Sequence, residues 1–333
     1  METYIVDVVP PKNLHSQDDS FTNWKSNGTL DCTEILPHAT YGNENCFINV
    51  KTHIVEKSPL LLTGNLKWPH YVTNNNLLSI TYQDELILSC HSQYNTRNSF
   101  TIIPENNEVE AICVEEDLLW VEGKLYAYSD LHCEHEVSFS VKPTGKQCLG
   151  ENSEIIQVGY ELDQFVEVYR VCFDTNVSLP LYSEVTMIST NNFTFPPDYN
   201  WINLFNVPPR AYNVYNCENS SFSCCIGKEK LVSDNDVMFG PARRSTLIEY
   251  FNSVPVWNHC DNNRTTWQNI EDVIRKQYAN RAEFKVWSGA AKYDSKDVPQ
   301  YLWKVARFND VESLAIVYVN DPQPNDSHVL CKD

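Results

Sequence analysis

Twelve cysteines constrain the fold of this 333-residue chain more than any other feature of its sequence. They are even in number and dispersed, and no C-x-x-C spacing occurs among them. Zinc sites need closely spaced cysteine pairs, so this pattern favours disulfides formed in an oxidising compartment. We therefore expect a secreted, disulfide-stabilised protein. The cysteines are Cys32, Cys46, Cys90, Cys113, Cys133, Cys148, Cys172, Cys217, Cys224, Cys225, Cys260 and Cys331.

Six N-x-S/T sequons agree with secretion and predict a glycoprotein. Residues 1–9 lack the basic start and the apolar stretch of a signal peptide, so we expect a mature form with an added Met1. No apolar run reaches the roughly 18 residues that a membrane span needs, so we expect no membrane partner. The sequon asparagines are Asn27, Asn176, Asn192, Asn219, Asn263 and Asn325.

The net charge of -19 argues against a general polyanion binder. The charge is uneven, however, because residues 228–307 hold 13 of the 25 Lys and Arg against 10 Asp and Glu, a local balance of +3. Ordinary charge on helix surfaces explains that balance equally well. The acidic remainder of the chain suits a basic protein partner.

Three regions differ in pattern. Residues 1–30 are polar and predict an N-terminal arm, and residues 31–160 predict a strand-rich region. Within it, residues 77–82, 85–90 and 136–141 alternate or run apolar between turn residues. Residues 161–333 mix strands and helices and predict a second domain.

The clearest helix is predicted over 266–278, where Trp267, Ile270, Ile274 and Tyr278 form one apolar stripe. Glu271 falls on that stripe, and a buried carboxylate needs a partner. Strands are predicted at 165–172, around 185–187, and at 284–287, 301–305 and 312–319, whereas 243–251 fits a helix or a strand.

The order of segments 228–230, 236–246, 252–257, 267–271 and 298–305 resembles the DNA/RNA non-specific endonucleases, especially their secreted arthropod branch of salivary and gut nucleases. The resemblance covers about residues 45–320. It implies an α+β fold: a strand-rich N-terminal region followed by a ββα-metal nuclease core with a central antiparallel sheet and flanking helices.

The resemblance also implies a chemistry, the single-metal hydrolysis of phosphodiesters. In such a site a histidine deprotonates water and one magnesium ion, held mainly by an asparagine, stabilises the leaving oxygen. By position, Lys228 stands at the arginine of the family's core motif, Glu229 at its glycine and Lys230 at its histidine. A second alignment puts Met238 at the base, and neither supplies a histidine.

Lysine is a poor replacement for the base, because its ordinary pKa of about 10.4 keeps it charged at neutral pH. Losing a general base costs on the order of 10²–10⁴-fold in rate. The resemblance therefore predicts a catalytically impaired protein, a pseudoenzyme. His259 is the one alternative base near the implied metal.

Other site positions are retained. Asn252 matches an active-site asparagine and Glu271 a glutamate that contacts metal-bound water. The metal-binding asparagine corresponds to Asn263, with Asn262 as a near-equal candidate, and a glycan on Asn263 would block magnesium. Whether magnesium is retained stays open.

Structural interpretations of the same residues remain open beside these roles. Asn252 is also suited to holding backbone groups in place, and Glu271 to a buried salt bridge with Arg243 or Arg244. Lys228 and Lys230 are then simply solvated charges.

We expect a secreted nuclease-fold protein that binds DNA or RNA without efficient cleavage. The side chains expected to contact phosphate are Lys228, Lys230, Arg243, Arg244 and Arg264. Two alternatives stay open. One is a secreted or salivary effector that binds a host protein, and the other is a weak magnesium-dependent DNA/RNA endonuclease.

Overall fold

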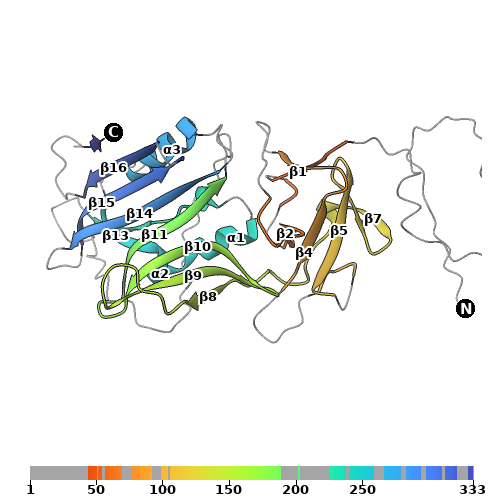
Figure 1. The fold of residues 1–333 in the computed structure, drawn as a ribbon, viewed down its shortest axis with the longest axis horizontal. Helices are drawn as coiled ribbons and strands as arrows, with labels where there is room; N and C mark the ends of the chain where they lie inside the picture. The colour runs from red at the N-terminus through yellow and green to blue at the C-terminus, as the bar shows by residue number, and fades with distance from the viewer. Residues whose placement is uncertain are drawn as a thin grey trace, which may run out of the picture. The chain divides into compact units, whose positions relative to one another are not determined.

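In the computed structural model the chain has an α+β fold built mainly from antiparallel strand ladders (Figure 1). Residues 42–333 form one compact unit, and the expected arm at 1–30 lies outside the described residues. The structure describes residues 44–50, 52–54, 57–69, 77–91, 99–103, 106–188, 202, 225–237, 240–258, 266–278, 283–293, 298–309, 312–320 and 329–332.

A five-stranded sheet forms the strand-rich region, in the order β2-β4-β5-β6-β7. A short pair, β1 (Cys46–Asn49) and β3 (Leu77–Ile80), accompanies it, and the Cys46–Cys113 disulfide ties β1 to β5. The predicted strands at 77–82 and 85–90 are therefore confirmed. The sheet consists of β2 (Leu60–Thr63), β4 (Glu85–Ser89), β5 (Glu108–Glu115), β6 (Leu118–Val121) and β7 (Lys124–Ala127).

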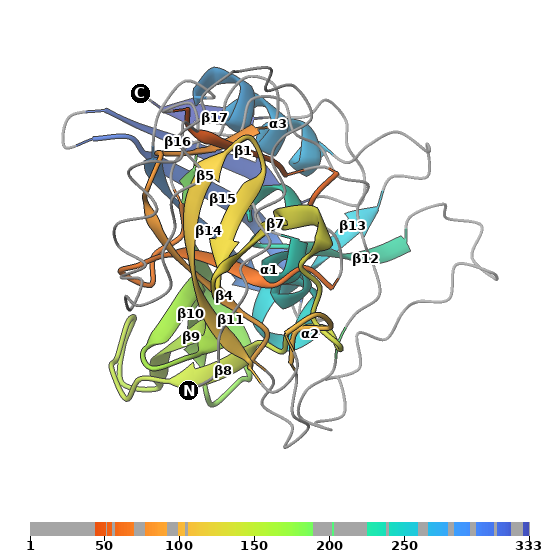
Figure 2. The ribbon, with the colours of Figure 1, turned by 90° about the vertical axis from the view of Figure 1, so that its right-hand side faces the viewer.

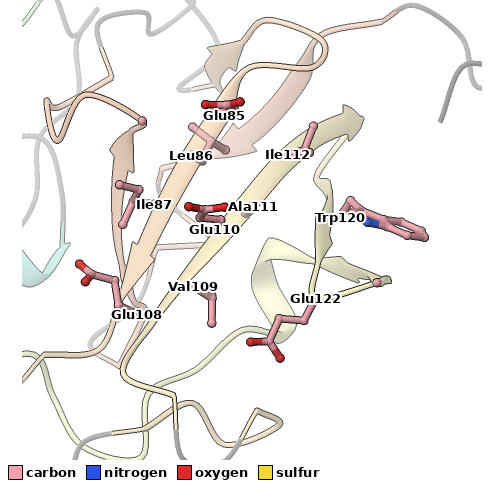
Figure 3. A pocket seen from close by; sticks show the side chains of 12 residues that line it. Glu85, Leu86, Ile87, Glu108, Val109, Glu110, Ala111, Ile112, Trp120 and Glu122 are labelled. Carbon is pink, nitrogen blue, oxygen red and sulfur yellow. The ribbon is translucent and has the colours of Figure 1, made fainter. Parts of the chain in front are cut away.

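The two faces of the five-stranded sheet differ because β5 alternates strictly at its start. Val109 and Ala111 are buried in the core, whereas Glu108 and Glu110 are exposed on the other face. This outer face carries a groove of about 530 Å³, whose lining residues Figure 3 shows.

An eight-stranded sheet, in the order β17-β16-β15-β14-β11-β10-β9-β8, forms the rest of the scaffold. The register aligns Tyr169, Val185, Val286 and Ala306 in one row, and all four are buried. Its strands are β8 (Ser140–Pro143), β9 (Ser153–Glu161), β10 (Phe165–Asp174), β11 (Leu179–Ile188), β14 (Glu283–Tyr293), β15 (Pro299–Arg307), β16 (Ser313–Val319) and β17 (Val329–Lys332).

Two expectations need adjustment here. The strand predicted over 136–141 is wrong for 136–139, because only Ser140 and Val141 join a strand, β8. The expected domain boundary at 160/161 falls between β9 and β10, which pair along the same sheet. The alternation that predicts a strand does not reveal which sheet a strand joins.

Short helices and a two-stranded ribbon lie in the chain between β11 and β14 of the eight-stranded sheet. The ribbon pairs β12 (Cys225–Lys230) with β13 (Ser253–Asn258), as Figure 2 shows beside α1 and α2. Between the two strands the chain forms a 3-10 turn (Asp234–Asp236), α1 (Gly240–Arg244), a second 3-10 turn (Ser245–Leu247) and α2 (Glu249–Asn252). Residues 243–251 are therefore helical except for Ile248, which is extended and forms an isolated bridge with Ile202.

Helix α3 (Thr266–Tyr278) has the predicted bounds. Trp267, Ile270 and Ile274 are buried, as the apolar stripe predicts. Among the described residues, no helix is long and apolar enough to cross a membrane.

Disulfides confirm part of the cysteine prediction. Besides Cys46–Cys113, the described residues contain Cys90–Cys133 and Cys148–Cys172. The remaining cysteine side chains, including that of Cys225, lie outside the described residues. Of the sequon asparagines, Asn176 is exposed in the turn between β10 and β11, and the other five lie outside the described residues.

Candidate functional site

The β12–β13 ribbon carries the three neighbouring residues Lys228, Glu229 and Lys230. Lys228 and Lys230 are two residues apart on β12, so their side chains share one face of the ribbon, and Glu229 points to the other. Lys230 stands opposite Ser253, the first residue of β13, next to the turn that follows β12. Lys230 is therefore the last residue of β12, and the 3-10 turn at Asp234–Asp236 follows it closely in the chain.

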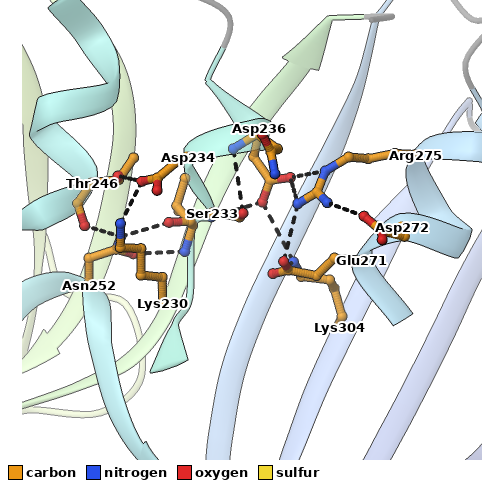
Figure 4. Close-up of polar contacts among 12 residues, drawn as sticks. Lys230, Ser233, Asp234, Asp236, Thr246, Asn252, Glu271, Asp272, Arg275 and Lys304 are labelled. Carbon is orange, nitrogen blue, oxygen red and sulfur yellow. Dashed lines mark hydrogen bonds and ion pairs between the residues drawn. The ribbon is translucent and has the colours of Figure 1, made fainter. Parts of the chain in front are cut away.

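Lys230 is not a solvated charge, which corrects that expectation, because only 8% of its surface is exposed. Its Nζ donates a hydrogen bond of 2.6 Å to Oδ1 of Asp234, which is also buried (Figure 4). The Thr246 hydroxyl donates to the same carboxylate oxygen. A lysine ammonium has three donors and no acceptor, so this arrangement cannot take a proton from water.

The half-buried cations Lys228 and Arg244 also have carboxylate partners. Lys228 forms an ion pair with Glu249 of α2, and Arg244 forms one with Glu136. Arg243 is half-buried, and Arg264 lies outside the described residues. The expected phosphate-binding side chains on Lys228, Lys230 and Arg244 are thus engaged within the protein.

Asn252 holds the backbone around it. Its side-chain Oδ1 accepts a hydrogen bond of 2.7 Å from the Val232 N–H, and its Nδ2 donates to the carbonyls of Val232 and Thr246, both at 2.8 Å. Asn252 is fully buried. These bonds pin the end of α2 to the chain just after β12, so the amide has a structural task at a position where buried polar groups need partners.

A second group of charges lies between α3, β15 and the 3-10 turn, and we call Asp236, Glu271, Arg275 and Lys304 the buried charge network. Lys304 Nζ donates to Glu271 Oε1 at 2.7 Å and lies 3.6 Å from Asp236 Oδ2. The Arg275 guanidinium donates to Asp236 Oδ1 at 2.7 Å and to Glu271 Oε2 at 3.1 Å. Figure 4 shows these contacts, with Asp272 at the edge of the network.

The charges of the network balance, since two carboxylates face two cations, and each of the four residues is at least nine-tenths buried. Burial by itself raises the pKa of Asp236, but Arg275 and Lys304 outweigh it, so the pKa of Asp236 lies below its ordinary value. For Arg275, burial opposes the charge, and Asp236 and Glu271 together raise its pKa above the ordinary value.

Local sequence explains how Asp236 reaches this position. Ser233 caps the 3-10 turn: its side chain accepts from the Asn235 N–H, and the Ser233 N–H donates to Asp236 Oδ2 at 3.0 Å. Serine followed three residues later by an acid is the capping-box pattern. The cap fixes Asp236 so that its other oxygen faces Arg275.

Glu271 is therefore a salt-bridge partner of Arg275 and Lys304, and the expected partners Arg243 and Arg244 are wrong. Arg244 lies at the end of α1, and it pairs with Glu136. Arg275 follows Glu271 by four residues, a helical spacing that makes the pair readable from the sequence. Nothing in the sequence indicates that Asp236 and Lys304 join them, since a sheet and a turn bring them together.

A magnesium ion does not fit the described part of the motif. Asn252 is occupied by backbone groups, and each oxygen of Glu271 already accepts a hydrogen bond from a cation. A metal ion next to Glu271 would also meet the positive charges of Arg275 and Lys304. Among the described residues, no three His, Cys, Asp or Glu side chains are grouped to hold a metal. The other positions named from sequence, Asn262, Asn263, His259 and Met238, lie outside the described residues.

Two histidines, His132 and His135, flank Cys133 in the strand-rich region. Cys133 forms a disulfide with Cys90, and His135 is exposed. His132 is half-buried.

Parts of this chain are similar to known proteins. The family model described as DNA/RNA non-specific endonuclease matches residues 151–330, which is 180 of the 333 residues. A search of curated proteins finds no match. Among solved structures, a chain in the crystal structure of the EndoG/EndoGI complex, which concerns the mechanism of EndoG inhibition, aligns with a TM-score of 0.36 at 14% identity, covering 49% of this chain and 76% of that one.

Proposed function

The chain belongs to the DNA/RNA non-specific endonuclease family, and from this premise we propose that it is a secreted nuclease-fold protein that binds nucleic acid without cleaving it efficiently. The family supplies the scaffold and the ligand class. The departure from efficient hydrolysis comes from the residues of this chain.

The Lys230–Asp234 pair carries the proposal. Hydrolysis of a phosphodiester needs a group that removes a proton from water near neutral pH. In the alignment that assigns the family's histidine to residue 230, that group is replaced by a buried lysine whose Nζ is 2.6 Å from a buried carboxylate. The ammonium donates a hydrogen bond to this carboxylate and has no lone pair with which to accept a proton. Lys230 is therefore a hydrogen-bond donor, whereas hydrolysis needs a group at this position that accepts a proton from water.

Nucleic-acid binding by this protein should be weak and strongly dependent on salt. Lys228 and Arg244 are paired with Glu249 and Glu136, so a phosphate must displace a carboxylate to reach either cation. Such an exchange gains little, because the cation loses one ion pair for each ion pair that it forms with phosphate. What remains is the release of counterions, and that contribution falls as the salt concentration rises.

Three disulfides and an exposed Asn176 within a sequon support an extracellular location for this proposed function. The secreted arthropod branch, with its salivary and gut nucleases, is the setting that we propose. Mass spectrometry of the protein from its natural source, before and after removal of N-glycans, tests the location through occupancy of Asn176.

The test of the proposed function is a cleavage assay and a gel shift on the same protein. We expect plasmid DNA and RNA to stay intact in magnesium, and a nucleic-acid complex to form at low salt and disappear as salt rises. The variant Lys230→His introduces an imidazole facing Asp234, and it should raise cleavage by roughly 10²–10⁴-fold if the base alone is missing. Lys230→Met is the matched control, because it removes the charge without supplying a base.

Rapid cleavage by the unaltered chain, abolished by EDTA and unaffected by Lys230→Met, would overturn the proposal. In that case His259→Ala decides whether the second candidate base carries the activity. A chain that neither cleaves nor forms a complex at low salt is not a nucleic-acid binder, and a protein ligand is then favoured.

A protein ligand is the second candidate function, and one observation favours it. The groove on the five-stranded sheet is lined by four glutamates, so it repels phosphate and attracts basic groups.

A further inference from the structure

The outer face of the five-stranded sheet is an exposed surface that the nuclease family does not explain, because it lies outside residues 151–330. Glu85 of β4, Glu108 and Glu110 of β5, and Glu122 after β6 are all exposed there. We call these four residues the acidic face. Figure 3 shows their side chains around the groove of about 530 Å³.

Apolar side chains stand between the carboxylates. The strand register sets Ile112 opposite Glu85 on one side and Trp120 on the other, and it sets Ile87 opposite Glu110. Ile87, Ile112 and Trp120 are half-buried, so part of each is available to a ligand. Along β5 the face carries Glu108, Glu110 and then Ile112, and across the strands Ile87 lies beside Glu110 and Ile112 beside Glu85, so acidic and apolar groups are interspersed.

The carboxylates of the acidic face lack cationic partners. None of the four glutamates forms an ion pair with another described residue, and the lining of the groove contains no lysine or arginine. Burial and the nearby Asp163 raise the pKa of Glu108, although His91 acts in the opposite direction. The local field is therefore negative and uncompensated.

The spacing suits one kind of ligand. Glu108 and Glu110 are two residues apart on one strand, which separates them by about 6.8 Å, and adjacent strands lie about 4.8 Å apart. An extended polypeptide repeats its own side chains at the same interval of about 6.8 Å. Successive side chains point to opposite sides of such a segment, so basic and apolar side chains at positions i and i+2 both reach the interspersed carboxylates and apolar groups of the face.

We propose that the acidic face docks an extended, basic segment of another protein, whose arginine or lysine side chains pair with Glu85, Glu108, Glu110 and Glu122 while its apolar side chains contact Ile87, Ile112 and Trp120. Charge complementarity selects this occupant, and the apolar groups distinguish it from a small polycation. The docking does not depend on whether the chain cleaves nucleic acid.

The probe for this surface is a fluorescein-labelled peptide of repeating Arg-Ser-Val-Ser units, which presents arginine and valine on the same side when extended, and binding to the full chain is measured by fluorescence anisotropy. We expect the double variant Glu85→Gln/Glu110→Gln to bind the peptide about tenfold more weakly, because two partly shielded charges are lost. The matched control is Glu44→Gln/Glu151→Gln, which removes two exposed carboxylates outside the groove and should bind as the unaltered chain does.

Two further probes decide the nature of the occupant. A peptide with serine in place of valine should bind several-fold more weakly, because it forgoes the contacts with the apolar side chains of the face. Equal binding of both peptides, or full competition by spermine at the same concentration of charge, would show a mere attraction for cations and overturn the proposal. Equal affinity of the groove variant and the control variant would overturn the location.

Discussion

Two regions of the molecule contain several carboxylates each. In one the carboxylates are paired with cations, and in the other no described cation pairs with them. In the buried charge network, Asp236 and Glu271 each contact both Arg275 and Lys304 at 3.6 Å or less. On the acidic face, four glutamates lie around one groove without a cation in its lining.

Burial explains the difference. A carboxylate that leaves water loses several kcal/mol of solvation unless a cation and hydrogen bonds replace it. Asp236 and Glu271 have almost no exposed surface, so the fold is stable only with their partners in place. The glutamates of the acidic face stay hydrated, so no partner is required for folding, and they remain available for a ligand. Paired charges thus indicate structure, and unpaired exposed charges indicate binding.

The largest expected effect comes from removing one partner of the network. Arg275→Met leaves Asp236 and Glu271 with Lys304 alone, and it should lower the free energy of unfolding by about 3–5 kcal/mol, measured by urea denaturation with the disulfides intact. The control is Lys276→Met on the exposed side of the same helix, which should change it by less than about 0.5 kcal/mol. Similar losses in the two variants would contradict the role assigned to Arg275.

A double-mutant cycle on Lys230 and Asp234 separates a buried pair from an exposed one. Lys230→Met, Asp234→Asn and their combination should give a coupling energy of about 0.5–3 kcal/mol, because each single variant leaves a buried partner without its opposite charge. The same cycle on Lys285 and Glu184, whose lysine side chain is 51% exposed, should give less than about 1 kcal/mol. A larger coupling energy for Lys285 and Glu184 than for Lys230 and Asp234 would contradict the expectation that burial strengthens the pair.

Acid should weaken the network only at a lower pH than it neutralises Glu108 of the acidic face, because the pKa of Glu108 is raised and that of Asp236 is lowered. Since the pKa of Asp236 is lowered in the folded state, its contribution to stability is complete above the ordinary value of 3.8 and is lost as pH falls through the folded value. Stability followed from pH 7 to pH 3 should therefore fall less steeply at acid pH in Asp236→Asn than in the unaltered chain. Parallel curves would show that Asp236 is not the group responsible.

The smallest effect is expected on the acidic face itself. Glu110→Gln removes an exposed charge that forms no ion pair with any described residue and lies among other glutamates, so the free energy of unfolding should change by less than about 0.5 kcal/mol, with any change toward greater stability. Thermal and urea denaturation at low salt are the measurements. A loss above about 1 kcal/mol would mean that Glu110 has a structural partner and would count against the docking proposal.

Much of the site was readable from the sequence because local patterns carry it. The stripe of Trp267, Ile270 and Ile274 predicted α3 with its bounds, and the position of Glu271 on that stripe predicted a buried carboxylate with a partner. The identity of the partner was wrong, because Lys304 comes from β15, 33 residues away, and no local pattern shows that β15 lies against α3.

The interpretation of Lys230 shows the same limit. The motif placed it at the position of the base, but its burial and its bond to Asp234 depend on the turn that folds residues 231–236 back over the end of β12. The acidic face was also out of reach, because Glu85 and Glu110 are distant in the chain and only the pairing of β4 with β5 aligns them.

The sequence alone determined the family, the cysteines that form disulfides, the main helix and most strands, since each of these follows from residue order or from a short period along the chain. The tertiary structure decided which charges are paired and which are left to solvent. The physical reason is that pairing and burial depend on distances between side chains from separate elements, and no local pattern specifies those distances.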